Sequence, residues 1–107
     1  MSYDLLVALW DPVQRKHVLK AAAEYDRRGQ LEFLARHHFG RATAYLLVLD
    51  GKSYDSKAIL GVAYLYATGR PLGPHDFHGG VHGAAGVLRG LDFEILNIRD
   101  RDRLTGS

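Results

Sequence analysis

The sequence predicts an α+β fold, a single compact domain in which about four helices pack around a small sheet of two or three strands. Two observations carry this prediction. Apolar residues recur at helical spacing in segments that end at glycines, and an apolar run followed by Asp50-Gly51 is typical of a β-hairpin. The 107 residues match the usual size of one domain, so we expect one unit over residues 1–107. Its core would span about 13–98, and residues 99–107 would form a charged tail that frays.

The first part of the chain predicts two helices. Asp11-Pro12 is typical of a helix start, because an Asp side chain caps free backbone N–H groups and Pro fits the first turn. A helix from this start would end at Gly29, and a second helix would end at Gly40. The apolar face of the first helix would be formed by Val18, Ala21, Ala22 and Tyr25. The shared face of the second would be formed by Leu31, Leu34, Ala35 and His38.

The middle of the chain predicts a hairpin that leads into a central helix. Residues 44–49 form an apolar run, Asp50-Gly51 is a typical tight turn, and a short second strand would extend through Tyr54. A helix capped by Asp55 or Ser56 would follow. Because this helix is apolar on nearly all sides, we expect it at the centre of the core.

The last part of the chain predicts a long loop, a helix and a strand. The loop begins after Gly69 and runs to Gly80, and it is rich in glycine, proline and histidine. The apolar residues of the last helix would be Val81, Ala84, Ala85 and Leu88. The apolar residues of a closing strand would be Phe93, Ile95 and Ile98.

The composition excludes several classes of protein. No cysteine is present, so a disulfide framework, a thiolate zinc site and a catalytic cysteine are all excluded. No apolar stretch reaches the roughly 20 residues that cross a bilayer, and Met1–Trp10 lacks the basic leader and cleavage site of a signal peptide. We therefore expect a cytoplasmic protein with no membrane partner.

Basic residues gather around the two first helices and the hairpin, although the net charge of the chain is only +2. Such residues either bind DNA phosphates or form an ordinary solvated surface. If they bind DNA, the backbone contacts would come from Arg36, His38, Arg41, Lys52 and Lys57. The loop segment His78-Gly79-Gly80 would add a second contact, because glycines let backbone amides approach a phosphate closely.

Two other groups of residues invite a chemical role. The first consists of His75, Asp76, His78 and His82. These residue types bind zinc or iron, but their spacing matches no metal-site template. The second group, Ser56 and Lys57, resembles a nucleophile beside a base, yet neighbouring helical residues point about 100° apart. We therefore predict no metal, no cofactor and no enzymatic activity.

The junction between the second strand and the central helix is a candidate pocket. A helix N-terminus presents free N–H groups and a positive dipole, which favour an anion such as a phosphate. The side chains placed there are Tyr54, Asp55, Ser56 and Ala58, with Tyr45 on the first strand. Tyrosines at these positions would either stack on a base or pack in the core with a polar edge.

Four runs of residues carry a resemblance to a known family. They are Phe39-Gly40-Arg41-Ala42, Tyr45-Leu46-Leu47-Val48, the segment 50–59 and Asp76-Phe77-His78-Gly79-Gly80. With these runs the chain resembles the N-terminal domain of HNH-type, modification-dependent (type IV, McrA-like) restriction endonucleases, a domain similar to the sulfur-binding domain that reads phosphorothioate DNA. The resemblance implies a module that binds modified double-stranded DNA, joined to a nuclease domain in a longer chain. Nothing here resembles that nuclease domain, because Asn97 is the only asparagine and no His-Asn-His pattern occurs.

The resemblance also implies roles for single residues. In the sulfur-binding relatives a Tyr-Pro-x-Lys-Ala motif forms an apolar cup for sulfur, and Tyr54, Lys57 and Ala58 match it. Asp55 stands in place of the proline, and a carboxylate would repel a phosphorothioate anion. Asp55 would instead accept a hydrogen bond from the amine of a modified base such as 5-methylcytosine or 5-hydroxymethylcytosine, or cap the helix. Both readings of the modification stay open, beside that of a protein-interaction domain with no nucleic-acid role.

Overall fold

The structure, a computed structural model, describes residues 9–99. In chain order its elements are α2 (Arg15–Arg28), α3 (Gln30–His37), β1 (Tyr45–Leu49), β2 (Lys52–Asp55), α4 (Ser56–Thr68), α5 (Ala84–Gly90) and β3 (Glu94–Asn97). They amount to four helices and one antiparallel sheet of three strands in the order β2-β1-β3. The predicted α+β fold is therefore confirmed. The charged tail lies outside the described residues except for Arg99.

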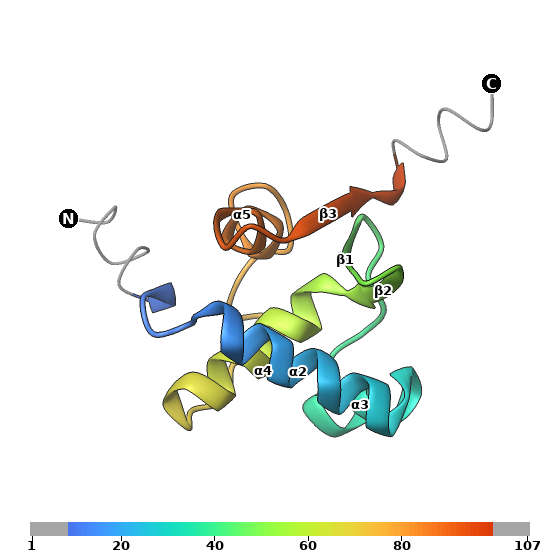
Figure 1. The fold of residues 1–107 in the computed structure, drawn as a ribbon. Coiled ribbons are helices and arrows are strands. Elements are labelled where there is room, and N and C mark those ends of the chain that lie inside the picture. The colour runs from blue at the N-terminus through green and yellow to red at the C-terminus, as the bar shows by residue number, and fades with distance from the viewer. Residues whose placement is uncertain (1–8, 100–107) are drawn as a thin grey trace.

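The helices α2, α3 and α4 pack together on one side of the molecule, and the sheet and α5 lie on the other side (Figure 1). α2 crosses α4 and makes its most extensive contacts there. None of the helices in residues 9–99 is long and apolar enough to cross a membrane.

The predicted hairpin is confirmed, and its turn explains the sequence there. Asp50 and Gly51 have φ angles of 53° and 78°, and two positive φ angles are what a type I′ turn requires. In the resulting register Leu47 pairs with Tyr54 of β2 and with Ile95 of β3. Leu47 is fully buried, so the middle strand fixes the sheet against the core.

α4 lies at the centre of the core, as its apolar sequence predicts. Ile59 and Leu60 are fully buried. Gly61 lets Phe39 lie directly on the helix, because a Cβ atom at position 61 would lie 2.5 Å from Cζ of Phe39. Phe39 itself is buried, and its ring packs edge-on against Phe77 with the ring centres 6.2 Å apart.

The first helix starts later than the sequence predicts. α2 begins at Arg15, because the chain turns over residues 10–13 and the Val13 N–H donates to the Trp10 carbonyl at 2.9 Å. This turn buries Val13. Asp11 and Pro12 are exposed in the turn and do not start the helix.

The second helix buries a different face from the predicted one. Phe33 and Leu34 are its buried residues, whereas Leu31 is 70% exposed. The expected face of Leu31, Leu34, Ala35 and His38 is therefore wrong, because the short helix turns Phe33 rather than Leu31 toward the ring of Tyr25 on α2. α3 also ends before Gly40, since His38 already has a left-handed φ of 64°.

The last helix begins at Ala84 rather than at Val81, because the residues before it fold tightly under its first turn. The Ala84 N–H donates to the His78 carbonyl at 2.7 Å. A Cβ atom at Gly83 would lie 2.0 Å from that same carbonyl oxygen, so the contact requires glycine. Glycine at position 83 therefore lets the end of the loop pack against the start of α5.

A buried carboxylate, that of Glu24, joins the three packed helices. Its oxygens accept hydrogen bonds from Arg28 Nε at 2.9 Å and from the Tyr66 hydroxyl at 2.7 Å, and one lies 2.6 Å from His37 Nε2. Burial alone would raise the pKa of Glu24, but the hydrogen bonds from His37, Tyr66 and Arg28 outweigh it and lower the pKa to about 2. The ionised form therefore stabilises the fold.

We expect this carboxylate to control the stability of the domain in acid. A depressed pKa contributes stability that is present above the ordinary value of 4.5 and is lost as the pH falls toward about 2. The contribution at neutral pH is about 3 kcal/mol, and Glu24→Gln should remove most of it. Denaturant unfolding between pH 7 and pH 2.5 measures this difference. Glu32→Gln is the control, since that exposed residue pairs only with Arg28, and equal pH profiles for the two variants would contradict the assignment.

Candidate functional site

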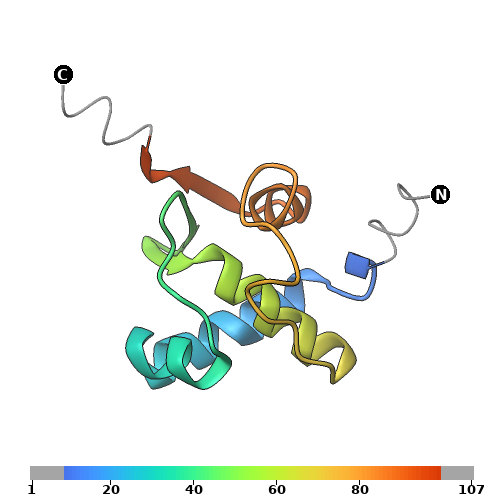
Figure 2. The ribbon, with the colours of Figure 1, turned by 180° about the vertical axis from the view of Figure 1, so that it is seen from behind.

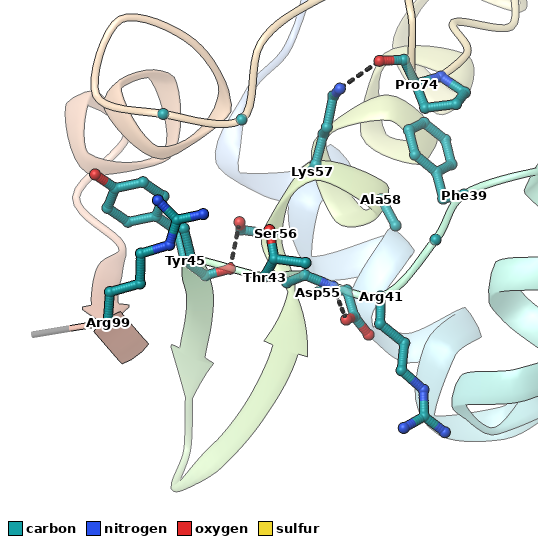
Figure 3. A pocket seen from close by; sticks show the side chains of 15 residues that line it. Phe39, Arg41, Thr43, Tyr45, Asp55, Ser56, Lys57, Ala58, Pro74 and Arg99 are labelled. Carbon is teal, nitrogen blue, oxygen red and sulfur yellow. Dashed lines mark hydrogen bonds between the residues drawn. The ribbon is translucent and has the colours of Figure 1, made fainter. Parts of the chain in front are cut away.

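A cavity of about 480 Å³ opens where the start of α4 meets two irregular segments of the chain. One segment links α3 to β1 and the other links α4 to α5, and both cross the face seen in Figure 2. Arg99, just after β3, lines the cavity beside Tyr45 (Figure 3). Long-range packing therefore builds this cavity, from parts of the chain that are far apart in sequence.

Three consecutive side chains at the junction of β2 and α4 each hold one wall of the cavity (Figure 3). Asp55 Oδ1 accepts the Ala42 N–H at 2.7 Å, and Ser56 Oγ donates to the Tyr45 carbonyl at 2.8 Å. Lys57 Nζ donates to the Pro74 carbonyl and lies 5.2 Å from the ring centre of Phe77. The junction thus positions both irregular segments and the start of β1.

The Asp55 side chain is buried and is bonded within the domain. It is 3% exposed, and its Oδ2 accepts two more hydrogen bonds, from the Tyr25 hydroxyl at 2.6 Å and from Gln30 Nε2 at 2.9 Å. Both oxygens are therefore occupied, and all of these donors are neutral. Burial, and then the contact with Asp55, raises the pKa of Tyr25, which keeps its hydroxyl protonated as a donor. The interpretation of Asp55 as the acceptor of a base amine stays a prediction, and in the structure its oxygens already accept hydrogen bonds from within the domain.

The prediction that the side chain of Asp55 or Ser56 caps α4 is wrong. Asp55 is the N-cap residue, but it makes no side-chain hydrogen bond to the first turn, and the Ser56 hydroxyl is used by Tyr45. Helices leave the N–H groups of their first turn without an intrahelical acceptor. Because Ser56, Lys57 and Ala58 line the cavity, the positive end of α4 lies at its wall.

Tyr54, predicted as part of the pocket, lies in the core. Its side chain is 3% exposed, and its ring packs against Tyr25 with the ring centres 4.9 Å apart. Its hydroxyl lies 3.0 Å from both carboxylate oxygens of Asp26. Burial and this carboxylate raise the pKa of Tyr54 to about 12. Tyr54 opposes buried Leu47 in the sheet register, and this position directs it away from the cavity.

The other predicted site residues divide into two groups. The cavity is lined by Tyr45, Asp55, Ser56, Ala58, Arg41, Lys57, Gly79 and Gly80. The remaining predicted contacts, Arg36, His38, Lys52 and His78, lie outside it. Among these, Lys52 lies 3.7 Å from Asp26, and His38 follows the end of α3.

Arg41 and Arg99 are the cations of the cavity whose guanidinium groups have no hydrogen bond or ion pair among residues 9–99. They lie on different sides of the cavity (Figure 3). Lys57, by contrast, already donates to Pro74. From its sequence position Arg99 is predicted only to belong to the charged tail. The pairing of Tyr45 with Asn97 brings the end of β3, and Arg99 after it, to the cavity.

One end of the cavity is apolar, and two of its residues were not predicted. Phe39 and Pro74 lie there beside Ala58 (Figure 3). The Phe39 ring is fixed by its contact with Gly61 on α4. The cavity therefore combines an apolar end, a helix N-terminus and two arginines that have no side-chain partner within residues 9–99.

The histidine-rich loop lines a second hollow of about 450 Å³. Its walls include His75, Asp76, His78 and His82 together with Trp10 and Phe77. Within residues 9–99 no group of three or more candidate ligands is placed to hold a metal ion. The carboxylate of Asp76 instead accepts the Gly73 N–H at 2.7 Å and closes the turn of the loop.

Removal of the Asp55 carboxylate should release the segment that forms one wall of the cavity. Asp55→Ala leaves the buried Tyr25 hydroxyl and Gln30 without an acceptor, and we expect a loss of about 3 kcal/mol in unfolding free energy. Hydrogen exchange of the Ala42 amide should accelerate more than that of amides in α4. Asp11→Ala, at an exposed position, is the control. An Ala42 amide that stays fully protected in Asp55→Ala would contradict this role.

Comparison with known proteins identifies the family. No curated protein matches the chain. A solved structure described as the Type IV phosphorothioation-dependent restriction endonuclease ScoMcrA is similar, with 36% sequence identity and a TM-score of 0.58. The similarity covers 79% of this chain but only 13% of that one. A family model described as the ScoMcrA-like, N-terminal head domain matches residues 11–97. Because this match spans most of the chain, the protein belongs to the family of ScoMcrA-like N-terminal head domains.

Proposed function

We propose that this chain is the DNA-contacting head domain of a modification-dependent restriction endonuclease, and that the cavity beside α4 receives part of a modified double-stranded DNA. The observation that carries the proposal is the pair of arginines, Arg41 and Arg99, whose guanidinium groups have no partner among the described residues, on a cavity that also contains a helix N-terminus. Guanidinium groups and helix N-termini both bind phosphate. The solved relative is a restriction endonuclease that depends on phosphorothioation, which supports DNA as the ligand.

The modification that we propose for this cavity is a phosphorothioate. A phosphorothioate combines an anionic phosphate with a sulfur atom that is a poor hydrogen-bond acceptor, so it needs cations on one side and apolar contacts on the other. Phe39, Ala58 and Pro74 supply the apolar side, and the arginines supply the charge. The proposed sulfur contact thus uses a different proline from the one that the motif of the sulfur-binding relatives would supply.

The proposal gives the chain a binding role and no catalysis. Ser56 and Lys57, the residues that resemble a nucleophile and a base, donate to separate carbonyls of Tyr45 and Pro74. Cleavage would belong to a nuclease domain elsewhere in a longer natural chain, since the similarity covers only 13% of the relative. A role on DNA also implies a cytoplasmic protein.

A titration of one duplex in four forms tests the proposed ligand. The forms are unmodified, phosphorothioate, 5-methylcytosine and 5-hydroxymethylcytosine DNA, compared by fluorescence anisotropy at near-physiological salt. We expect the phosphorothioate duplex to bind at least about tenfold more tightly than the others, or about 1.4 kcal/mol. Preference for a modified base would overturn the choice of phosphorothioate. No binding to any form would overturn the DNA role and favour a protein-interaction domain.

Arg41 and Arg99 should contribute to binding in the same way for every duplex. Arg41→Ala and Arg99→Ala should each weaken binding to all four forms and reduce the slope of log K against log salt by about one. Arg89→Ala is the matched control, because Arg89 is exposed on α5 and does not line the cavity. Equal losses in all three variants would mean that binding reflects net charge rather than this cavity.

A further inference from the structure

The cavity beside α4 is larger than one phosphate group needs. Its volume is about 480 Å³. Cavities of roughly 300–1,000 Å³ are those that hold a whole small molecule in proteins. A single phosphate or phosphorothioate group would fill only a small part of this space. The cavity can therefore accept the sugar and the base of a nucleotide as well as its phosphate.

Tyr45 offers a surface for such a base. Its ring lies at the wall of the cavity, beside Arg99 and apart from the apolar end that contains Phe39 and Pro74 (Figure 3). The side chain is half-buried, and its hydroxyl makes no hydrogen bond within residues 9–99. Nucleic-acid bases of any sequence stack on aromatic side chains, because every base has a flat face. The ring is therefore a stacking surface that the fold leaves accessible.

Gly80 leaves the space next to the Tyr45 ring open. A Cβ atom at position 80 would lie 3.9 Å from Cε2 of that ring, so a larger side chain would occupy the space beside it. Gly79 stands in the same relation to Lys57, with a Cβ atom 3.6 Å from its Cδ. Neither glycine has the positive φ that Gly51 adopts, so the backbone does not require glycine at either position. The two glycines thus keep this part of the cavity free of side chains.

A base that reaches Tyr45 has to leave the base stack of the duplex. Paired bases are stacked inside the double helix, and proteins reach one of them in a pocket by turning its nucleotide out of the duplex. Such a nucleotide has one phosphate before it and one after it along the strand. Arg41 and Arg99 lie on different sides of the cavity, which suits these two flanking phosphates (Figure 3).

We propose that the cavity receives one whole nucleotide of the modified strand, turned out of the duplex, with its base stacked on Tyr45 in the space that Gly80 leaves open. This inference rests on the proposed DNA role of the cavity. Turning a nucleotide out costs the free energy of unstacking and unpairing, and this cost is lowest where the base is already mismatched. A mismatch at that position should therefore strengthen binding.

Affinity for paired and mismatched duplexes tests the inference. Phosphorothioate duplexes that are fully paired, or mismatched at the nucleotide on either side of the modified linkage, are titrated by fluorescence anisotropy. The wild type should bind one of the mismatched duplexes about tenfold more tightly than the paired one, or about 1.4 kcal/mol. Gly80→Leu fills the space beside the ring and Tyr45→Leu removes the ring, so each should bind the paired and mismatched duplexes equally. Tyr45→Phe should keep the preference, since it retains the ring.

Gly90→Leu is the matched control for the substitution at Gly80. A Cβ atom at this exposed position would meet nothing within 4 Å, and Gly90 does not line the cavity, so the preference should be unchanged. If Gly80→Leu does not fold, Gly80→Ala takes its place. Its Cβ atom makes only an ordinary contact with Tyr45, so this variant should fold and should reduce the preference.

The outcomes separate this inference from the proposed function. If the wild type binds the paired and mismatched phosphorothioate duplexes equally, no nucleotide is turned out, and the inference is overturned while DNA binding by the cavity stands. If the preference survives in the variants of both Gly80 and Tyr45, the base does not lie on this ring, and the inference is overturned as well. Absence of binding to every duplex would overturn the DNA role itself.

Discussion

The buried carboxylate of Asp55 is the constraint on which the site depends. A carboxyl group can lie in a protein interior only if hydrogen bonds replace its hydration. Here Tyr25 of α2, Gln30 of α3 and the Ala42 amide supply them, so this side chain joins two helices to the irregular segment beside the cavity. Ser56 and Lys57 continue this role through their hydrogen bonds to the Tyr45 and Pro74 carbonyls, and the start of α4 becomes a fixed frame to which the neighbouring segments are bonded.

This frame explains why the cavity is available to a ligand. The polar groups that build it bond to one another, while Arg41 and Arg99 have no such partners among the described residues. Preorganised structure lowers the entropic cost of binding, because the walls need not be ordered when the ligand arrives. The same frame divides the surface in two, since the Lys57–Pro74 contact separates the arginine-bearing cavity from the histidine-bearing hollow.

Local patterns in the sequence predict the elements, but long-range contacts decide the site. Asp50-Gly51 predicts the hairpin because its turn needs two positive φ angles, and the apolar character of α4 predicts its central position. The role of Asp55 depends on partners 25 and 30 residues away, which no local pattern reveals. Arg99 reaches the cavity only through the pairing of β3 with β1. The burial of Tyr54 could not be predicted from the sequence either, because a tyrosine in a strand fits the core and a binding surface equally well.

Contact between DNA and the face around the start of α4 is tested most directly by NMR. Amide resonances of the ¹⁵N-labelled domain are followed while the phosphorothioate duplex is added. We expect the shifted amides to cluster in residues 40–45, 56–58 and 75–80, with the outer surfaces of α2 and α3 unchanged. Shifts concentrated at exposed Leu19 and Leu31, with the cavity amides unmoved, would contradict it.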